Sequence, residues 1–197
     1  MNNAFQINTS ETSKIHPHKL LMWIAIASIC MMFAGWTSAF VVRNAQGNWL
    51  LFDLPQTFTF STVVILASSL TMHLSLSAFR KRDMTRYKAF ISITAFLGVL
   101  FMILQLLGYK QMHSSGITLA SNHEGVSGSF IYLISGVHLL HMLGGVIALV
   151  ITFLVVNFRR NKKVYSSTGI EILSTYWHFV DVLWIYLFLF FLYFQSK

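Results

Sequence analysis

Five apolar stretches, each of about twenty residues or more, limit what this chain can fold into. A helix rises about 1.5 Å per residue, so roughly 20 apolar residues cross the hydrocarbon core of a bilayer, which is about 30 Å thick. In hydrocarbon, only helices and closed barrels satisfy their own backbone groups. We therefore predict an all-α fold: a polytopic membrane bundle with a polar N-terminal tail at 1–19, one transmembrane domain at 20–197, and five transmembrane helices at 20–42, 58–79, 89–109, 130–156 and 174–194.

The amino-acid composition supports the membrane class. Hydrophobic residues make up 55% of the 197 residues and charged residues only 10%. The net charge of +8 raises nucleic acid as a partner. However, the basic residues stand in short runs beside the apolar stretches, as in Arg80, Lys81 and Arg82, and again in Arg159 and Arg160. Such runs are typical of topology signals and of contacts with lipid headgroups. We therefore expect membrane phospholipids as partners and no nucleic acid.

The basic residues also predict the orientation of the chain in the membrane. Eleven of the 14 Lys and Arg residues belong to the N-terminal tail and to the second and fourth connections, which share one side; only Arg43, Lys110 and Lys197 fall on the other. Basic residues are retained on the cytoplasmic side. We therefore predict a cytoplasmic N-terminus, an external C-terminus and a multi-pass location in the bacterial inner membrane.

The last span is unusual because it carries ionisable side chains. Glu171, His178 and Asp181 fall, with Ser174 and Thr175, within an arc of roughly 120° on a helix of about 3.6 residues per turn. Ionisable groups in hydrocarbon are costly and are functional candidates by default. This polar stripe requires polar partners, since lipid offers none.

The fourth span offers candidate partners for this stripe. His138 and His141 lie one turn apart on one face. At about 1.5 Å per residue they lie roughly 12 and 17 Å below the outer surface, whereas His178 and Asp181 lie roughly 6–18 Å above the inner one. We therefore expect His138, His141, Glu171, His178 and Asp181 to form a polar interhelix network near the middle of the membrane.

Four kinds of site use buried histidine or carboxylate side chains on membrane helices. A di-iron centre requires Glu-x-x-His pairs, which the sequence lacks, whereas a haem site stays open because glycines lie near His138 and His141. A static hydrogen-bonded network that joins the fourth and fifth helices is the favoured interpretation. A proton relay is a further interpretation, because His and Asp side chains can exchange protons. A relay must reach water at one end, and only Glu171 is near a helix end. We predict no catalytic residue and no metal ligand.

Two further sets of residues predict contacts between helices. Small residues let helix backbones approach closely, so we assign helix packing to Gly35, Ala39, Gly144 and Gly145. Polar side chains in the second and third spans are expected to form interhelix hydrogen bonds rather than to act in catalysis; they are Ser68, Ser69, Thr71, His73 and Gln105.

Several segments resemble one family. YWHFVDVLWIYLFLFFLYF resembles the last helix of subunit III of the haem–copper (cytochrome c) oxidases, and SGSFIYLISGVHLLHMLGGVIAL resembles the helix before it, with His-x-x-His followed by two glycines. MWIAIASICMMFAGWTSAFVVR and TFSTVVILASSLTMHLSLSAFRKRD match the family's corresponding earlier helices, and GIEILSTYW places Glu171 at the family's position. The likeness covers about residues 20–194 in order and indicates the short, five-helix form.

The resemblance implies a non-catalytic accessory subunit. In this family, haem and copper are held by subunits I and II, and subunit III stabilises subunit I, carries structural lipids and assists proton uptake. The expected partners are therefore subunits I and II, phospholipids and further respiratory complexes. The expected function is support of aerobic electron transport and proton pumping by a cytochrome c oxidase. A quinol oxidase, a nitric oxide reductase-associated homologue and an ion or proton transporter are the alternatives.

Two departures from the family limit what carries over. Many members have seven helices, so the cleft that holds lipid between two bundles in the longer form is absent here or filled by another subunit. In addition, Ile29 follows Ala27 and Ser28 where the family commonly has a buried glutamate. A proton role of that glutamate therefore does not transfer to this chain.

Overall fold

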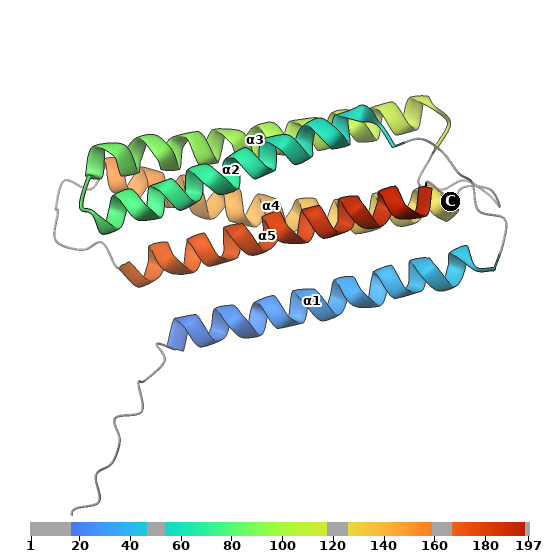
Figure 1. Cartoon of the computed structure of the whole chain (residues 1–197), viewed down its shortest axis with the longest axis horizontal. Coiled ribbons are helices and arrows are strands. Elements are labelled where there is room, and N and C mark those ends of the chain that lie inside the picture. Colours follow the sequence, from blue (N-terminus) through green and yellow to red (C-terminus); the bar gives the residue numbers. More distant parts are fainter. Residues whose placement is uncertain (1–16, 47–53, 118–125, 159–166, 196–197) are drawn as a thin grey trace, which may run out of the picture.

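A computed structural model describes residues 17–46, 54–117, 126–158 and 167–195 of the chain. These residues form five helices, α1 (Pro17–Asn44), α2 (Gln56–Arg80), α3 (Met84–Ser114), α4 (Val126–Phe158) and α5 (Ser167–Gln195) (Figure 1). Each helix contains a segment long and apolar enough to cross a membrane. The predicted five-helix, all-α fold is therefore confirmed.

The helices extend beyond the predicted spans, because hydropathy marks the hydrocarbon-crossing part and not the helix ends. α1 begins at Pro17, so the last three residues of the predicted tail are helical, and proline is well suited to a first turn. α3 continues to Ser114, five residues beyond the end of the predicted span at 89–109. Between α2 and α3 the chain turns at Arg82, where φ is 58°, and the Asp83 carboxylate accepts a hydrogen bond from the Arg86 backbone N–H.

The helices alternate in direction (Figure 1). The N-terminal ends of α1, α3 and α5 lie with the C-terminal ends of α2 and α4 at one end of the bundle, which we call the Glu171 end. The opposite end carries Arg43 and is called the Arg43 end. This arrangement agrees with the grouping of connections used above, while the side of the membrane that each end faces stays a prediction.

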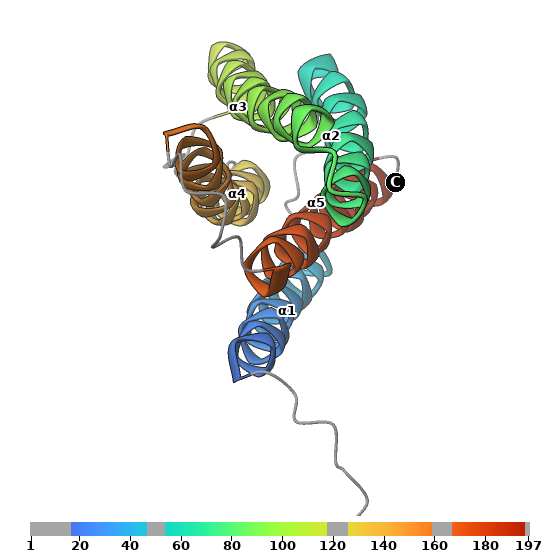
Figure 2. The same ribbon diagram turned by 90° about the vertical axis from the view of Figure 1, so that its left-hand side faces the viewer.

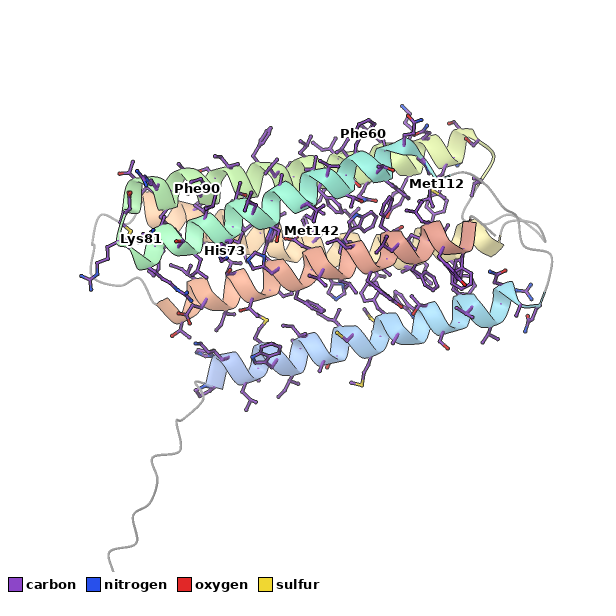
Figure 3. The ribbon with its side chains drawn as sticks, in the orientation of Figure 1. Phe60, His73, Lys81, Phe90, Met112 and Met142 are labelled. Carbon is purple, nitrogen blue, oxygen red and sulfur yellow. The ribbon has the colours of Figure 1, made fainter. Side chains whose placement is uncertain are left out.

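α5 lies at the centre of the bundle (Figure 2). It packs against α1, α2 and α4, whereas α3 packs against α2 and α4. In an apolar segment of 18 residues taken from each helix, 44% of the residues are buried in α5 but only 17% in α1. Figure 3 shows Phe60 pointing away from the bundle and Met142 inside it, as expected when the outer surface faces lipid.

Two buried tryptophans of α5 pack at the centre of the bundle and bond to α2. Trp177 and Trp184 are both fully buried, and their indole N–H groups donate to the hydroxyls of Ser68 and Thr62 on α2, at 3.1 and 3.0 Å. Gly98 on α3 faces the ring of Trp177, since a Cβ added there would lie 2.7 Å from it. The polar groups of these large side chains are therefore satisfied inside the bundle.

Candidate functional site

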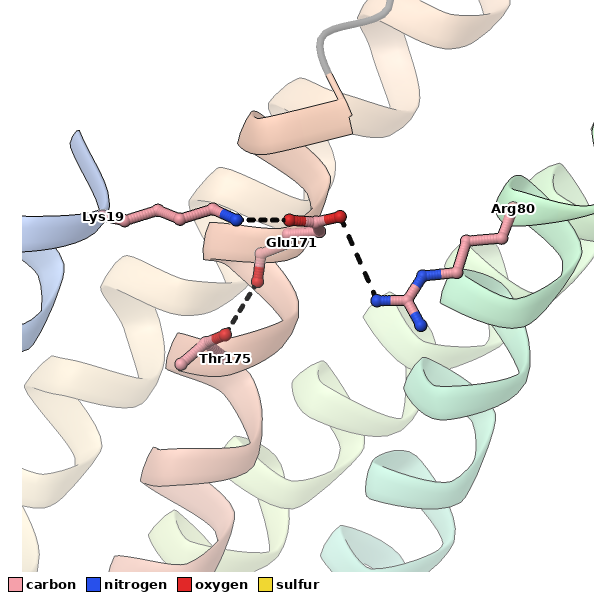
Figure 4. Close-up of polar contacts among 4 residues, drawn as sticks. All are labelled: Lys19, Arg80, Glu171 and Thr175. Carbon is pink, nitrogen blue, oxygen red and sulfur yellow. Dashed lines mark hydrogen bonds and ion pairs between the residues drawn. The ribbon is translucent and has the colours of Figure 1, made fainter. Parts of the chain in front are cut away.

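The Glu171 end carries a cluster of charges that joins three helices (Figure 4). The Glu171 carboxylate on α5 accepts a hydrogen bond from Lys19 Nζ on α1 at 2.7 Å and lies 4.0 Å from the Arg80 guanidinium on α2. The Thr175 hydroxyl donates to the Glu171 backbone carbonyl at 2.9 Å. The sequence predicted partners for Glu171 on α4, but the structure supplies them from α1 and α2.

An open cavity of about 360 Å³ lies beside this cluster. Its lining comes from α1, α2 and α5 and includes Lys19, Trp23, His73, Arg80, Glu171 and His178. His73, which Figure 3 labels, lies on α2. Along α5 the cavity extends from the charged rim at Glu171 to His178, two turns further on.

His178 is bonded to α2 and not to α4. Its Nδ1 lies 2.7 Å from the Ser69 hydroxyl, and its ring centre lies 6.4 Å from that of His73. Its pairing with Ser69 confirms the interhelix hydrogen bond expected of that serine.

Asp181 lies one turn deeper in the same interface. Its exposed fraction is 1%, and neither carboxyl oxygen has a hydrogen-bond partner among the described residues. His178, which lies one helical turn before Asp181, bonds to Ser69 on α2, so Asp181 and Ser69 border the same α2–α5 interface. Asp181 is thus a buried acid with unfilled bonding capacity.

The two histidines of α4 lie apart from these groups. His138 is fully buried among aromatic rings, with ring-centre distances of 5.2 Å to Trp184 and 6.1 Å to Phe101, and neither ring nitrogen has a partner in the described chain. His141 Nδ1 pairs with the Val137 carbonyl of its own helix at 2.8 Å.

The predicted network of His138, His141, Glu171, His178 and Asp181 is therefore not formed as one unit. A hydrogen bond that does join α4 and α5 comes from the Tyr176 hydroxyl, which donates to the His141 backbone carbonyl at 2.9 Å. The prediction failed because an arc of about 120° on α5 can face more than one neighbouring helix. The hydrogen bonds of α5 side chains run mainly to α2 and less to α4. The sequence already placed hydroxyls on α2 but did not indicate that α5 was their partner.

Other predicted interhelix hydrogen bonds are confirmed. Ser68 accepts the Trp177 N–H, the Thr71 hydroxyl pairs with that of Thr94 on α3 at 2.9 Å, and Gln105 on α3 donates to Ser61 on α2 at 3.0 Å. These bonds run from α2 to α3 and α5.

The small residues predicted to pack helices are divided between the inside and the outside. A Cβ added to Gly145 would lie 3.1 Å from the Trp177 ring, so this glycine packs against α5. Added to Gly35 or Gly144, a Cβ would meet nothing within 4 Å, and Ala39 is exposed. Those three residues therefore pack no helix of the described bundle, because they face outward.

The basic residues assigned to lipid contact fall in two regions. Arg80, Lys81 and Arg82 are exposed where α2 ends, at the Glu171 end of the bundle. Arg159 and Arg160 lie outside the described residues. Within the described ranges, no three His, Cys, Asp or Glu side chains come close enough together to hold a metal ion.

These features define a class: a multi-span helical membrane protein with a small polar cavity at one end and no metal-binding cluster in the part described. The cytochrome c oxidase subunit III family matches residues 51–196, which include α2 to α5. The chain belongs to this family, whose members bind no haem or copper themselves.

Individual bacterial proteins extend the similarity to most of the chain. A probable cytochrome c oxidase subunit 3 from Mycobacterium tuberculosis (strain ATCC 25618 / H37Rv) is 32% identical over 193 residues, which cover 91% of this chain and 92% of that protein. The cytochrome c oxidase subunit 3 of Bacillus subtilis (strain 168) is 26% identical over 195 residues, with the same coverage of both chains. The resemblance to the five-helix form is thereby confirmed.

Proposed function

We propose that this chain is a non-catalytic accessory subunit of a respiratory cytochrome c oxidase, in which it stabilises the catalytic subunit and so supports aerobic electron transport and proton pumping. The observation that carries the proposal is the family match across α2 to α5, together with 32% identity to a probable subunit 3 over 91% of the chain. Subunits I and II of the oxidase are the proposed protein partners.

The proposed location is the bacterial inner membrane, with the Glu171 end in the cytoplasm. The excess of Lys and Arg in the connections of that end supports this orientation. Arg80, Lys81 and Arg82 then lie where anionic headgroups gather, and they are proposed to contact phospholipid there.

The polar contacts of the bundle are proposed to keep α1 and α2 in place around α5. Glu171 joins α5 to Lys19 and Arg80, and His178 joins it to Ser69. Individual hydrogen bonds in membranes contribute only about 0.6 kcal/mol on average. Their proposed role is therefore to select the arrangement of helices that partner subunits recognise.

The proposal is tested by purifying the tagged full-length chain from its native membrane in mild detergent. Subunits I and II should be recovered with it in equal amounts, with a haem spectrum that changes on reduction and with oxygen consumption driven by reduced cytochrome c. An unrelated tagged membrane protein from the same cells is the control. Recovery of the chain without subunits I and II, or with a different redox enzyme, would contradict the proposal.

A further inference from the structure

Asp181 faces α2, as the hydrogen bonds of its neighbours show. Trp177, His178 and Trp184 all bond to hydroxyls on α2. On a helix with about 100° per residue, Asp181 lies within about 60° of each of these three side chains. Its carboxyl therefore belongs to the α2–α5 interface, one helical turn from His178, which bonds to Ser69.

The burial of this acid is not compensated by a partner. Asp181 is 1% exposed, and neither oxygen is hydrogen-bonded within the described residues. Within the described ranges no ion pair reaches Asp181: Lys19 and Arg80 are engaged with Glu171, which lies ten residues away, or about 15 Å along the helix. An ionised carboxylate is strongly disfavoured in such a place, whereas a neutral acid is tolerated. The site is thus suited to hold a proton.

A route for that proton leads to the cavity at the Glu171 end. The cavity is lined along α5 from Glu171 to His178, a distance of about 10 Å. His178 lines this cavity and pairs with Ser69 through Nδ1, and Asp181 follows one helical turn later on the face of α5 that meets α2. Imidazole and hydroxyl groups can each accept a proton at one position and release one at another.

In the opposite direction the interface is closed. Trp184 is fully buried one turn beyond Asp181, with its N–H held by Thr62. Its ring packs edge-on against Phe58 and Phe101, with ring centres 5.9 and 5.2 Å apart. Among the described residues, the open cavity therefore approaches Asp181 as far as His178, one turn away, whereas aromatic packing lies on the other side of Asp181.

We propose that Asp181 is an internal proton-binding site that exchanges protons with water only at the Glu171 end, through Ser69, His178 and the cavity. For uptake, the cavity-side nitrogen of His178 gains a proton from water and Nδ1 passes its proton to Ser69. The Ser69 hydroxyl passes its own proton to the Asp181 carboxylate. Only N–H and O–H bonds change, no electron moves, and the reverse sequence releases the proton.

Titratable or charged groups stand on every helix that packs against α5, and on α5 itself. On α5 these are Glu171 and His178, on α2 they are His73 and Arg80, on α1 Lys19, and on α4 His138 and His141. Glu171 is paired with Lys19 and Arg80, and the other ionisable groups of this set are histidines.

Infrared spectroscopy of the full-length chain in lipid nanodiscs tests the proposal, since the chain has only six Asp and Glu residues. A carbonyl band of a buried, protonated carboxyl should be lost in Asp181→Asn and kept in Asp83→Asn, which alters an acid outside the interface. Absence of any band that depends on Asp181 across the pH range in which the chain stays folded would overturn the proposal.

Exchange of this proton for deuterium tests the route. Ser69→Ala and His178→Gln should keep the band but slow its exchange roughly 100-fold, the lower range of what a positioned proton-transfer group contributes. Ser61→Ala makes the same change on the same helix, where the hydroxyl bonds to Gln105 of α3, and should leave the rate unaltered. Circular dichroism checks the fold of each variant. Unaltered exchange in both folded route variants, or in the one that folds, would overturn the proposal.

A thiol block tests the direction of access. In a Cys30→Ser background, Thr175→Cys places a thiol in the cavity lining, and Arg43→Cys places one at the other end. A bulky thiol reagent should slow exchange only at Thr175→Cys. Slowing at Arg43→Cys instead would show that protons enter from the other end.

Discussion

The two halves of α5 bury different kinds of side chain. From Glu171 to His178 the helix borders an open cavity and is joined to its neighbours by an ion pair and hydrogen bonds. From Trp184 to Phe191 it is enclosed by large apolar groups, and Trp184, Leu187 and Phe191 are all completely buried. We call these the open half and the closed half.

The comparison shows that one helix serves two purposes: one half mainly packs against its neighbours, and the other half also carries polar groups beside a cavity. Helices in lipid associate mainly through close packing, because lipid tails are as apolar as the side chains they would replace. The closed half supplies most of that packing, to which the open half adds the ring of Trp177, and we expect the closed half to contribute most to the stability of the bundle. The open half also brings polar groups to the cavity at one end.

The largest expected effect concerns the side of the membrane that the open half faces. In a Cys30→Ser background, a cysteine between Arg80 and Lys88 should react with a membrane-impermeant reagent only from the cytoplasm, and one at Ser115 only from outside, as the bias of basic residues requires. Labelling intact cells and inside-out vesicles measures this all-or-none difference. The opposite pattern would place the cavity on the external side.

Truncating the closed half should have the largest effect on stability. Trp184→Ala removes a fully buried ring and leaves the Thr62 hydroxyl without its donor, so we expect a loss of about 3–5 kcal/mol in the free energy of unfolding. Trp23→Ala is the matched control, since Trp23 is 61% exposed on α1. Thermal unfolding in one detergent compares them. Equal losses in the two variants would show that the closed half is not the stabilising one.

Filling the space around Trp177 should have a smaller effect. In Gly98→Val the new side chain meets the Trp177 ring, and overpacking of this kind costs about 1–3 kcal/mol. Gly144→Val has free space within 4 Å and serves as the control within the isolated chain. The same unfolding assay applies, and a larger loss for Gly144→Val than for Gly98→Val would be inconsistent with this packing.

The smallest effect is expected at the rim of the open half. Glu171→Gln removes the charge that pairs with Lys19 and Arg80, whose side chains are 44% and 65% exposed, so the loss should be below about 1 kcal/mol. The difference from the unaltered chain should shrink further in high salt, because salt screens exposed pairs. A loss as large as that of Trp184→Ala would show that the open half also carries the stability of the bundle.

The sequence predicted the fold better than it predicted the site. Five spans followed directly from hydropathy, because lipid leaves the backbone few alternatives. The partners of the polar residues did not follow, since an arc on α5 does not specify which neighbouring helix it faces. His138 was expected to pair with α5 through a polar bond and instead packs against Trp184.

Residues that look alike in the sequence can have different surroundings in the structure, which a sequence pattern does not predict. Gly35 and Gly145 both satisfy a small-residue pattern, yet only Gly145 has a bulky ring against it. In the sequence Ser69 resembles any other serine of α2, and only the structure shows that it pairs with His178 of α5. Such differences depend on the rotation of each helix about its axis, which hydropathy does not determine.

The central claim is that this chain contributes structure to a redox complex and carries no redox centre of its own. The most direct test is the metal and haem content of the isolated full-length chain, separated from its partners and stripped of loosely bound metal. We predict no visible absorption band and no stoichiometric haem, copper or iron, while the intact complex from the same membranes shows haem. One haem or one metal ion retained per isolated chain would contradict the claim.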